Sequence, residues 1–456
     1  MNTPPDPARP STALADFVAG LRLQAVPDGT TMRAKQILLD AVGCAIAAGS
    51  GEELGQVEAF ADSLGPGADT TVVGGAARRA LPGAVLVNGY RVTAVTVCDV
   101  YTPAHCHVTP EVMPPTLAIA ERERAPGAAV LSAWIGGLEV ATRVARGLGY
   151  AEFRRRGWHS PGVVGPLGGA AAVASLLALD ARETRNAIAL AGSQSAGTWA
   201  AWGTPAVKFH QARGALSGLL GGLLAAQGFP GADEILANPD GGIYPTYAGG
   251  GDPAAAVEAL GERWELGEIS LRRWPSGTPI QPVITALFAL LEDEPIEAEE
   301  VQRVIVDVPR SVYRAHDRFG VPDGTFVALL SIRYAVAVIL HDRDAWLPQF
   351  AADRYGDPAL GRFVTERVEL RADDALSPDG ARVTIARTDG TRHERTVEVA
   401  KGHPRDPLSD EELEAKVHRC ADAVIGREAT DELIARVLRL EDETDIRGIL
   451  ALTRPS

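Results

Sequence analysis

Lysine, cysteine and methionine are all scarce in this chain of 456 residues. Only four of its 44 basic residues are lysines, so a lysine between two apolar stretches stands out; the four are Lys35, Lys208, Lys401 and Lys416. The four cysteines never show CxxC spacing, which fits free thiols in a reducing cytoplasm. We therefore expect a cytoplasmic protein.

An excess of positive charge and a membrane-spanning run are also missing. The net charge of −15 argues against a nucleic-acid or anionic-membrane partner, although local cations can still hold a small anionic substrate. The apolar runs 167–179 and 215–226 are too short to span a bilayer, and residues 1–17 lack the features of a signal peptide. With 46% hydrophobic and 23% charged residues, the composition is that of a soluble globular protein of two or three domains.

Helical spacing of apolar residues runs through the first 264 positions. Leu14, Phe17 and Leu21 recur at intervals of three and four, and Asp180 with Glu183 is typical of a capped helix start. Small residues within these stretches would let neighbouring helices approach closely. The expected helices cover residues 14–21, 31–48, 80–97, 114–123, 128–148, 167–179, 181–191 and 212–226.

The pattern changes near Trp264. Residues 301–308, 362–371, 381–387 and 391–399 alternate as strands do, and Asp389-Gly390 predicts a hairpin turn between the last two. Helices are expected over 281–291 and 325–341, and the chain becomes helical again after Ser409. The fold class is therefore mainly α with a smaller α+β lid domain. We place the all-helical domain at 1–264 and 402–456 and the lid at 265–401.

Groups able to transfer protons gather in the stretch 157–219. His159 precedes a small-residue helix, and Lys208 lies where the chain leads into another. Histidine is a natural acid or base at neutral pH, and a desolvated lysine can lose its proton whereas arginine cannot. The structural alternatives are a turn-capping His159 and a Lys208 whose ammonium reaches solvent.

Seven segments together resemble the MmgE/PrpD family, which includes 2-methylcitrate dehydratase, cis-aconitate decarboxylase and iminodisuccinate epimerase. The resemblance covers nearly the whole chain and rests on the order and spacing of the segments. It implies an all-helical domain, a smaller lid, a homodimer, and a site between lid and helices that needs no cofactor. The segments are 40–44 (DAVGC), 87–89 (VNG), 99–107 (DVYTPAHCH) leading into Met113-Pro114, 159–165 (HSPGVVG), 208–214 (KFHQARG), 272–275 (RRWP) and 331–334 (SIRY).

The resemblance also assigns candidate site residues. Catalysis is expected from His107, His159, Lys208, Asp99 and Tyr313, and substrate binding from Arg272, Arg273, His210 and Arg213. Each has a structural alternative: Arg273 as an exposed surface residue, for example, and Tyr313, at the end of a strand, as a packing residue.

Two positions depart from the family's pattern. Asp99 stands alone where relatives commonly carry an Asp pair, and Arg272 stands where they tend to carry a lysine. An arginine there offers a bidentate clamp for a carboxylate but no proton transfer. Asp99, His105, Cys106 and His107 also resemble metal ligands superficially; a His-x-His pair without further ligands in register is a weak signal, so we expect no metal.

These features predict a cofactor-independent lyase or isomerase that acts on a small polycarboxylate. Fixed cations would stabilise enolate-like charge while a histidine moves a proton at the carbon beside a carboxylate. Dehydration of a 2-methylcitrate-like acid is the nominal prediction. The alternatives are epimerisation or decarboxylation of a specialised substrate, or a non-catalytic dimeric descendant that binds a metabolite.

Overall fold

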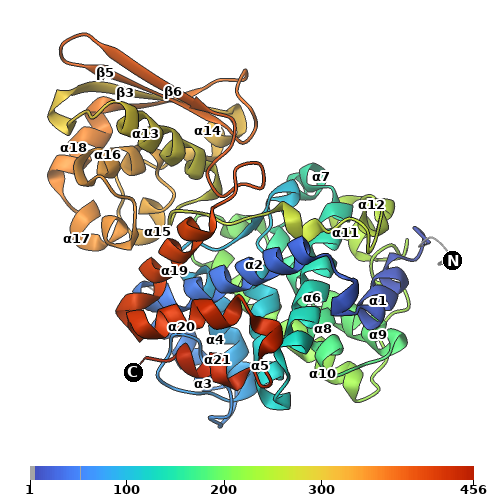
Figure 1. The fold of residues 1–456 in the computed structure, drawn as a ribbon. Coiled ribbons are helices and arrows are strands. Elements are labelled where there is room, and N and C mark those ends of the chain that lie inside the picture. The colour runs from blue at the N-terminus through green and yellow to red at the C-terminus, as the bar shows by residue number, and fades with distance from the viewer. Residues whose placement is uncertain (1–5, 52, 456) are drawn as a thin grey trace. The chain divides into compact units, whose positions relative to one another are not determined.

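The computed structural model describes residues 6–51 and 53–455 and divides the chain into two compact units (Figure 1). The first unit comprises Met1–Ser270 and Ser409–Ser456, and the second comprises Leu271–Leu408. The divisions thus fall after residues 270 and 408, where the sequence had suggested 264 and 401. Each unit is described by itself below.

The described residues of the first unit form mainly helices, together with a two-stranded pairing of β1 (Val100–Tyr101) with β2 (Ile269–Ser270). The predicted capping box is confirmed, because the Asp180 side chain accepts from the Glu183 N–H and the Glu183 side chain bonds back. Its α-helices are α1 (Pro10–Gly20), α2 (Asp28–Ile46), α3 (Leu54–Asp62), α4 (Leu81–Ala94), α5 (Thr109–Glu123), α6 (Gly127–Leu148), α7 (Tyr150–Arg155), α8 (Ser160–Leu176), α9 (Ala181–Gly192), α10 (Ala206–Ala226), α11 (Ile243–Ala248), α12 (Pro253–Val257), α19 (Asp410–Ile425), α20 (Arg427–Val437) and α21 (Arg447–Leu452).

Three of these helices begin five to seven residues before the predicted start. α5 begins at residue 109 instead of 114, α8 at 160 instead of 167, and α10 at 206 instead of 212. Pro110 and Pro161 lie in the first turns of α5 and α8, where proline is tolerated, whereas Pro114, Pro115 and Pro166 lie inside these helices. The glycines of α8 allow the neighbouring backbones to approach closely. A Cβ on Gly168 of α8, for example, would lie 2.6 Å from the Gly137 carbonyl oxygen of α6. Tertiary contact therefore overrides a local sequence that reads as a break.

Helix α6 is long and apolar enough by composition to cross a membrane. However, 83% of its most apolar window is buried inside the first unit, where α8 packs against it. Trp134 of α6 is fully buried and donates from its indole N–H to the Ala34 carbonyl at 2.8 Å. These are the surroundings of a core helix.

The second unit is built on a four-stranded sheet with the order β4-β3-β5-β6. Strands β3 (Val301–Val308) and β4 (Val368–Ala372) are parallel, whereas β5 (Ala381–Arg387) is antiparallel to both β3 and β6 (Arg392–Val397). Helices α13 and α16 pack on this sheet (Figure 1). The helices are α13 (Gln281–Asp293), α14 (Arg310–His316), α15 (Thr325–Ala328), α16 (Ile332–Asp342), α17 (Ala352–Tyr355) and α18 (Pro358–Arg367).

The hairpin at Asp389-Gly390 is confirmed, but the strand predicted over 362–371 is largely wrong. Gly390 adopts a φ of 89°, which favours glycine, and joins β5 to β6. Residues 358–367 instead form α18, because the Asp357 side chain accepts from the Ala359 N–H and so caps a helix whose first residue is a proline. The helix predicted over 325–341 is two helices, since the Ser331 side chain caps a new start for α16.

Candidate active site

Asp99 directly precedes β1 in the sequence, and its fully buried side chain lies at the N-terminus of α5. Its carboxylate accepts hydrogen bonds from the Val108 N–H at 3.0 Å, the Thr109 N–H at 3.3 Å and the Thr109 hydroxyl at 2.5 Å. These donors are groups that a helix N-terminus leaves unsatisfied. Burial raises the pKa of Asp99 to about 6, although the bonds from Thr109 and Val108 oppose that rise. The structure therefore gives Asp99 a helix-capping position.

His107 is half-buried at the end of the same loop. Its Nδ1 lies 2.5 Å from the Asp99 carbonyl oxygen and 3.8 Å from the Cys98 sulfur. A carbonyl only accepts, so Nδ1 carries a hydrogen and Nε2 is the nitrogen that gains or loses a proton. The loop thereby fixes the tautomer of a candidate acid or base.

Cys98, Asp99 and His107 place possible metal-ligand atoms within 4.8 Å of one another. However, three donors already bind the Asp99 carboxylate, and His107 Nδ1 donates to a carbonyl, so His107 could offer a cation only its Nε2. Of the other two residues considered, the His105 ring lies against Tyr150, with ring centres 4.8 Å apart. The absence of a metal stays a prediction.

His159 is the N-cap residue of α8, with 7% of its surface exposed. Its Nδ1 lies 3.2 Å from Nδ1 of His210, which α10 supplies. Burial holds the pKa of His159 well below 6.5, and positive charge on His210 and His107 would lower it further. The pKa of His210 is lowered by burial and then by Arg213. Both shifts favour the neutral form of the pair, in which one hydrogen lies between the two Nδ1 atoms.

Lys208 lies in the first turn of α10 and is 4% exposed. The loop position expected from the sequence is therefore wrong. The ammonium donates to the Ala94 carbonyl at the end of α4, at 2.5 Å. The Lys208 side chain is therefore buried and does not extend into solvent. In sequence, Lys208 lies two residues before His210 on α10.

Arg213 makes contacts that suit a structural arginine. Its guanidinium donates to the carbonyls of Gln194 at 2.7 Å, Gly162 at 2.8 Å and Ala196 at 2.9 Å. These bonds tie α10 to the start of α8 and to the turn after α9. Its role in binding an anion stays a prediction.

The remaining three candidates lie in the second unit. Arg272 is 3% exposed and donates to the Ser276 carbonyl at 3.0 Å. Arg273 is exposed, with its guanidinium 5.3 Å from the Trp274 ring centre. Tyr313 lies in α14 and packs partly buried against the unit's core, so its expected place at a strand end is wrong. Their roles toward a substrate stay predictions.

A groove of about 330 Å³ lies on the first unit beside the start of α10. Its lining is mainly apolar, includes Phe60, Tyr90 and Phe209, and contains none of the candidate residues. A carboxylate gains little in such surroundings. The polar cluster around His107, His159 and His210 is therefore the better candidate site.

Sequence reasoning missed Glu111, a fully buried residue in the first turn of α5. Within the part of the chain that the structure describes, neither carboxyl oxygen of Glu111 has a hydrogen-bond partner. The Glu111 Cγ packs closely against two glycines. A Cβ on Gly165 would lie only 2.3 Å from it, and a Cβ on Gly214 only 2.9 Å. The sequence signal was an acidic residue inside an apolar stretch, hidden because the helix was expected to begin at residue 114.

Glu111→Gln should remove a pH dependence from the stability of the first unit. Burial, and then the charge of Asp99, raise the pKa of Glu111 well above 4.5 in the folded chain. Above pH 4.5 the unfolded chain releases this proton while the folded chain keeps it. Stability is therefore lost as pH rises toward the folded pKa, by about 1.4 kcal/mol per pH unit. Urea midpoints of both proteins between pH 4 and pH 8 measure this difference.

The matched control is Glu121→Gln. Glu121 is also buried, but its carboxylate accepts from the Thr71 N–H and hydroxyl at 2.7 Å each and pairs with Arg78 at 2.8 Å. This substitution should destabilise the protein at neutral pH. Equal pH slopes for wild type and Glu111→Gln would contradict a protonated Glu111.

Comparison with known proteins accounts for both units. Residues 12–256 match the MmgE/PrpD N-terminal domain, and residues 274–441 match the MmgE/PrpD C-terminal domain. The cis-aconitate decarboxylase-like protein oryM of Aspergillus oryzae is 27% identical, over 96% of each chain. The cis-aconitate decarboxylases of Mus musculus and Aspergillus terreus are each 26% identical, covering 97% and 96% of this chain and 93% and 94% of their own. The chain therefore belongs to the MmgE/PrpD family.

Proposed function

We propose that this protein is a lyase that removes CO2 from a small unsaturated tricarboxylate of the cis-aconitate type, without a cofactor. The proposal rests on the site geometry and on three relatives that this chain matches over nearly their whole length. Two of them are named cis-aconitate decarboxylase and one cis-aconitate decarboxylase-like. It replaces the dehydration of a 2-methylcitrate-like acid as our preferred reaction.

The observation that carries the proposal is that the Asp99 carboxylate already accepts hydrogen bonds from the protein. Dehydration needs one group that removes a proton beside a carboxylate and a second that protonates the departing hydroxyl. The carboxylate of Asp99, eight residues before His107, is occupied by three donors at the start of α5. Decarboxylation needs only one proton donor at carbon, and histidine alone can supply it.

The proton donor we assign is His107. Loss of CO2 breaks a carbon–carbon bond, and its electron pair forms a new double bond in the substrate. The pair of the former double bond then takes a proton at the carbon beside a remaining carboxylate. His107 would deliver that proton from Nε2, while the Asp99 carbonyl stabilises the imidazolium through Nδ1.

Substrate carboxylates would be held by the groups around this histidine. The helix starts of α8 and α10 meet at the His159–His210 contact, and the Ser160 hydroxyl donates to the His105 carbonyl at 3.4 Å. Helix N-termini favour negative charge, and Lys208 in the first turn of α10 would add a cation at that helix start. A neutral His159 that accepts the hydrogen of His210 at Nδ1 carries its own hydrogen on Nε2, from which it can donate to a carboxylate.

Proton NMR in D2O tests the proposal with cis-aconitate, citrate, 2-methylcitrate and iminodisuccinate, accompanied by capture of released CO2. The expected result is CO2 from cis-aconitate and one deuterium at the new methylene carbon of the product. Dehydration of 2-methylcitrate or inversion of iminodisuccinate without CO2 would replace the proposal by the corresponding family alternative. Silence across the panel from folded protein would favour a metabolite-binding descendant.

A further inference from the structure

Tyr101 joins three segments of the first unit. As part of β1 it pairs with Ile269 of β2, and as an isolated bridge it pairs with Cys106. The Tyr101 N–H donates to the Cys106 carbonyl at 2.7 Å, and the Cys106 N–H donates back at 3.2 Å. Cys106 directly precedes His107, so one residue connects the candidate proton donor to residues 269–270.

The Tyr101 side chain makes a second connection to the same segment. The side chain is fully buried, and its hydroxyl donates to the Glu265 carboxylate at 2.6 Å. Thr102 adds a parallel link, because its hydroxyl donates to the Glu268 carbonyl at 3.2 Å. The loop 99–107 is therefore held to residues 265–270 by backbone and side-chain bonds together.

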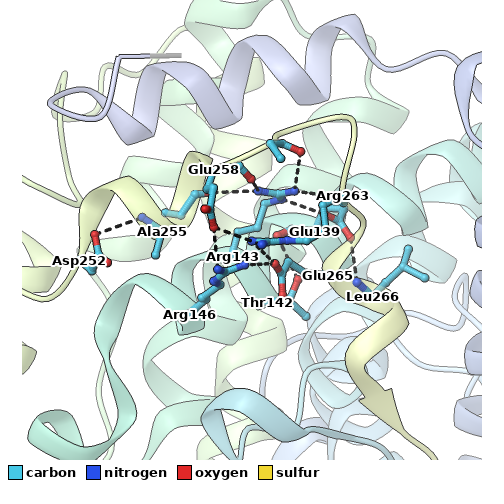
Figure 2. A network of polar contacts seen from close by, with 12 residues as sticks. Glu139, Thr142, Arg143, Arg146, Asp252, Ala255, Glu258, Arg263, Glu265 and Leu266 are labelled. Atoms are coloured by element: carbon cyan, nitrogen blue, oxygen red, sulfur yellow. Dashed lines mark hydrogen bonds and ion pairs between the residues drawn. The ribbon is translucent and has the colours of Figure 1, made fainter. Parts of the chain in front are cut away.

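Glu265 is itself fixed by charge. It is 3% exposed and pairs with Arg146 at 2.5 Å and Arg263 at 2.7 Å (Figure 2). Buried charges are expensive to desolvate unless they are paired and hydrogen-bonded, as this one is. The carboxylate that receives the Tyr101 hydroxyl is thus held from its other side by two guanidinium groups.

A fully buried ion pair on α6 anchors the same segment. Glu139 and Arg143 lie 2.8 Å apart with no exposed surface, and Glu139 also accepts from the Leu266 N–H at 2.9 Å (Figure 2). Arg143 donates to the Glu258 carbonyl at 2.9 Å. Residues 258–266 are therefore fixed to a rigid core helix, and the chain reaches the second unit at Leu271, directly after β2.

We propose that Tyr101 and Glu265 are positioning residues that hold His107 in register with the segment through which the chain passes to the second unit. The inference rests on the proposed function, because His107 is its proton donor. The contacts pass from Glu265 to the Tyr101 hydroxyl, from Tyr101 across its backbone pair to Cys106, and then to His107. Any displacement of residues 265–270 would move this histidine.

The test compares Tyr101→Phe with Tyr334→Phe. Tyr334 is a matched control, since its buried hydroxyl donates to the Gln349 carbonyl, also at 2.6 Å, within the second unit. Each substitution removes one buried hydrogen bond. Only Tyr101→Phe should lower kcat, by about 10- to 100-fold with little change in KM, because small misplacements of a reacting group are costly.

A substrate-free readout separates this inference from the proposed function. The imidazole signals of the nine histidines can be resolved in 13C-histidine-labelled protein, with His107→Gln identifying the His107 signal. Tyr101→Phe should shift the His107 signal and its titration, and should speed amide exchange at Cys106. Tyr334→Phe should leave all three unchanged.

An unshifted His107 signal in Tyr101→Phe would overturn the inference, whatever substrate the protein turns over. If that variant fails to fold, Thr102→Val removes the second link while leaving the Tyr101–Glu265 bond in place. A smaller shift of the same His107 signal is then expected. No shift in a folded Thr102→Val would likewise count against the inference.

Discussion

Lys208→Ala should lower kcat for decarboxylation by about 10²- to 10³-fold while the protein remains folded, a loss of the size caused by removing one fixed group that stabilises developing charge. The ammonium lies in the first turn of α10 and is 4% exposed, so water provides little substitute for it. In the proposed reaction, the negative charge that builds up as CO2 leaves would then no longer be balanced. Steady-state kinetics on the substrate identified by NMR measure the loss.

Lys35→Ala is the matched control for this prediction. Lys35 is also 4% exposed and also donates to a backbone carbonyl, that of Leu438 at 3.1 Å, beside a pair with Glu441 at 2.6 Å. It should cost stability but leave kcat within about twofold, since it contacts none of the candidate residues. Equal losses of kcat in the two variants would show that Lys208 acts only through the fold.

Lys208→Arg separates charge from proton transfer. Arginine keeps the positive charge but remains protonated at any pH the protein survives. If Lys208 serves only as a fixed charge, this variant should recover much of the lost activity. Activity as low as in Lys208→Ala would instead indicate that Lys208 moves a proton or that its short reach is essential.

Lys416→Met should lower the free energy of unfolding of the first unit by about 3–5 kcal/mol, the usual result of removing one partner from a buried ion pair. Helix α19 packs against α2 (Figure 1), and Lys416 of α19 bonds to Asp40 of α2. The two side chains are 3% and 1% exposed. The ammonium also donates to the Val97 carbonyl at 2.9 Å. Its loss leaves a buried carboxylate without a counter-charge, which urea unfolding of the full chain measures.

Two comparisons test whether the unpaired buried charge of Asp40 causes the loss of stability. Lys401→Met breaks a pair with Asp406 at 3.1 Å whose side chains are 24% and 46% exposed, so it should cost no more than about 1 kcal/mol. The double variant Asp40→Leu with Lys416→Met should recover most of the stability that the single variant loses, because apolar groups can replace a buried pair. A double variant as unstable as the single one would place the cost in packing rather than in charge.

Local patterns predicted those elements whose signals lie within a few residues. The capping box at Asp180 and Glu183 and the turn at Asp389-Gly390 depend on hydrogen bonds and backbone angles of neighbouring residues, and both were predicted. The starts of α5 and α8 were not, because proline and, in α8, glycine read locally as breaks; the missed residues 206–211 of α10 contain neither. The helical state of α8 depends on close contacts such as that of Gly168 with the Gly137 carbonyl.

The candidate site divides in the same way. Residue types and the family resemblance were enough to single out His159 and Lys208, since few side chains exchange protons near neutral pH. They did not indicate that three donors at the start of α5 bind the Asp99 carboxylate, or that the Arg213 guanidinium donates to backbone carbonyls. Such partners are distant in sequence or belong to the main chain, so no side-chain pattern records them.

The sequence by itself determined that this chain is a mainly helical member of its family with a smaller α+β unit, because helical and strand periodicities and motif order are local properties of the chain. Only the tertiary structure decided the raised pKa of Glu111, the lowered pKa of His159 and His210, and the attachment of His107 to residues 265–270. Each of these depends on burial and on distances between segments far apart in the chain. Desolvation and hydrogen bonding act through space, and so they appear only once the chain has folded.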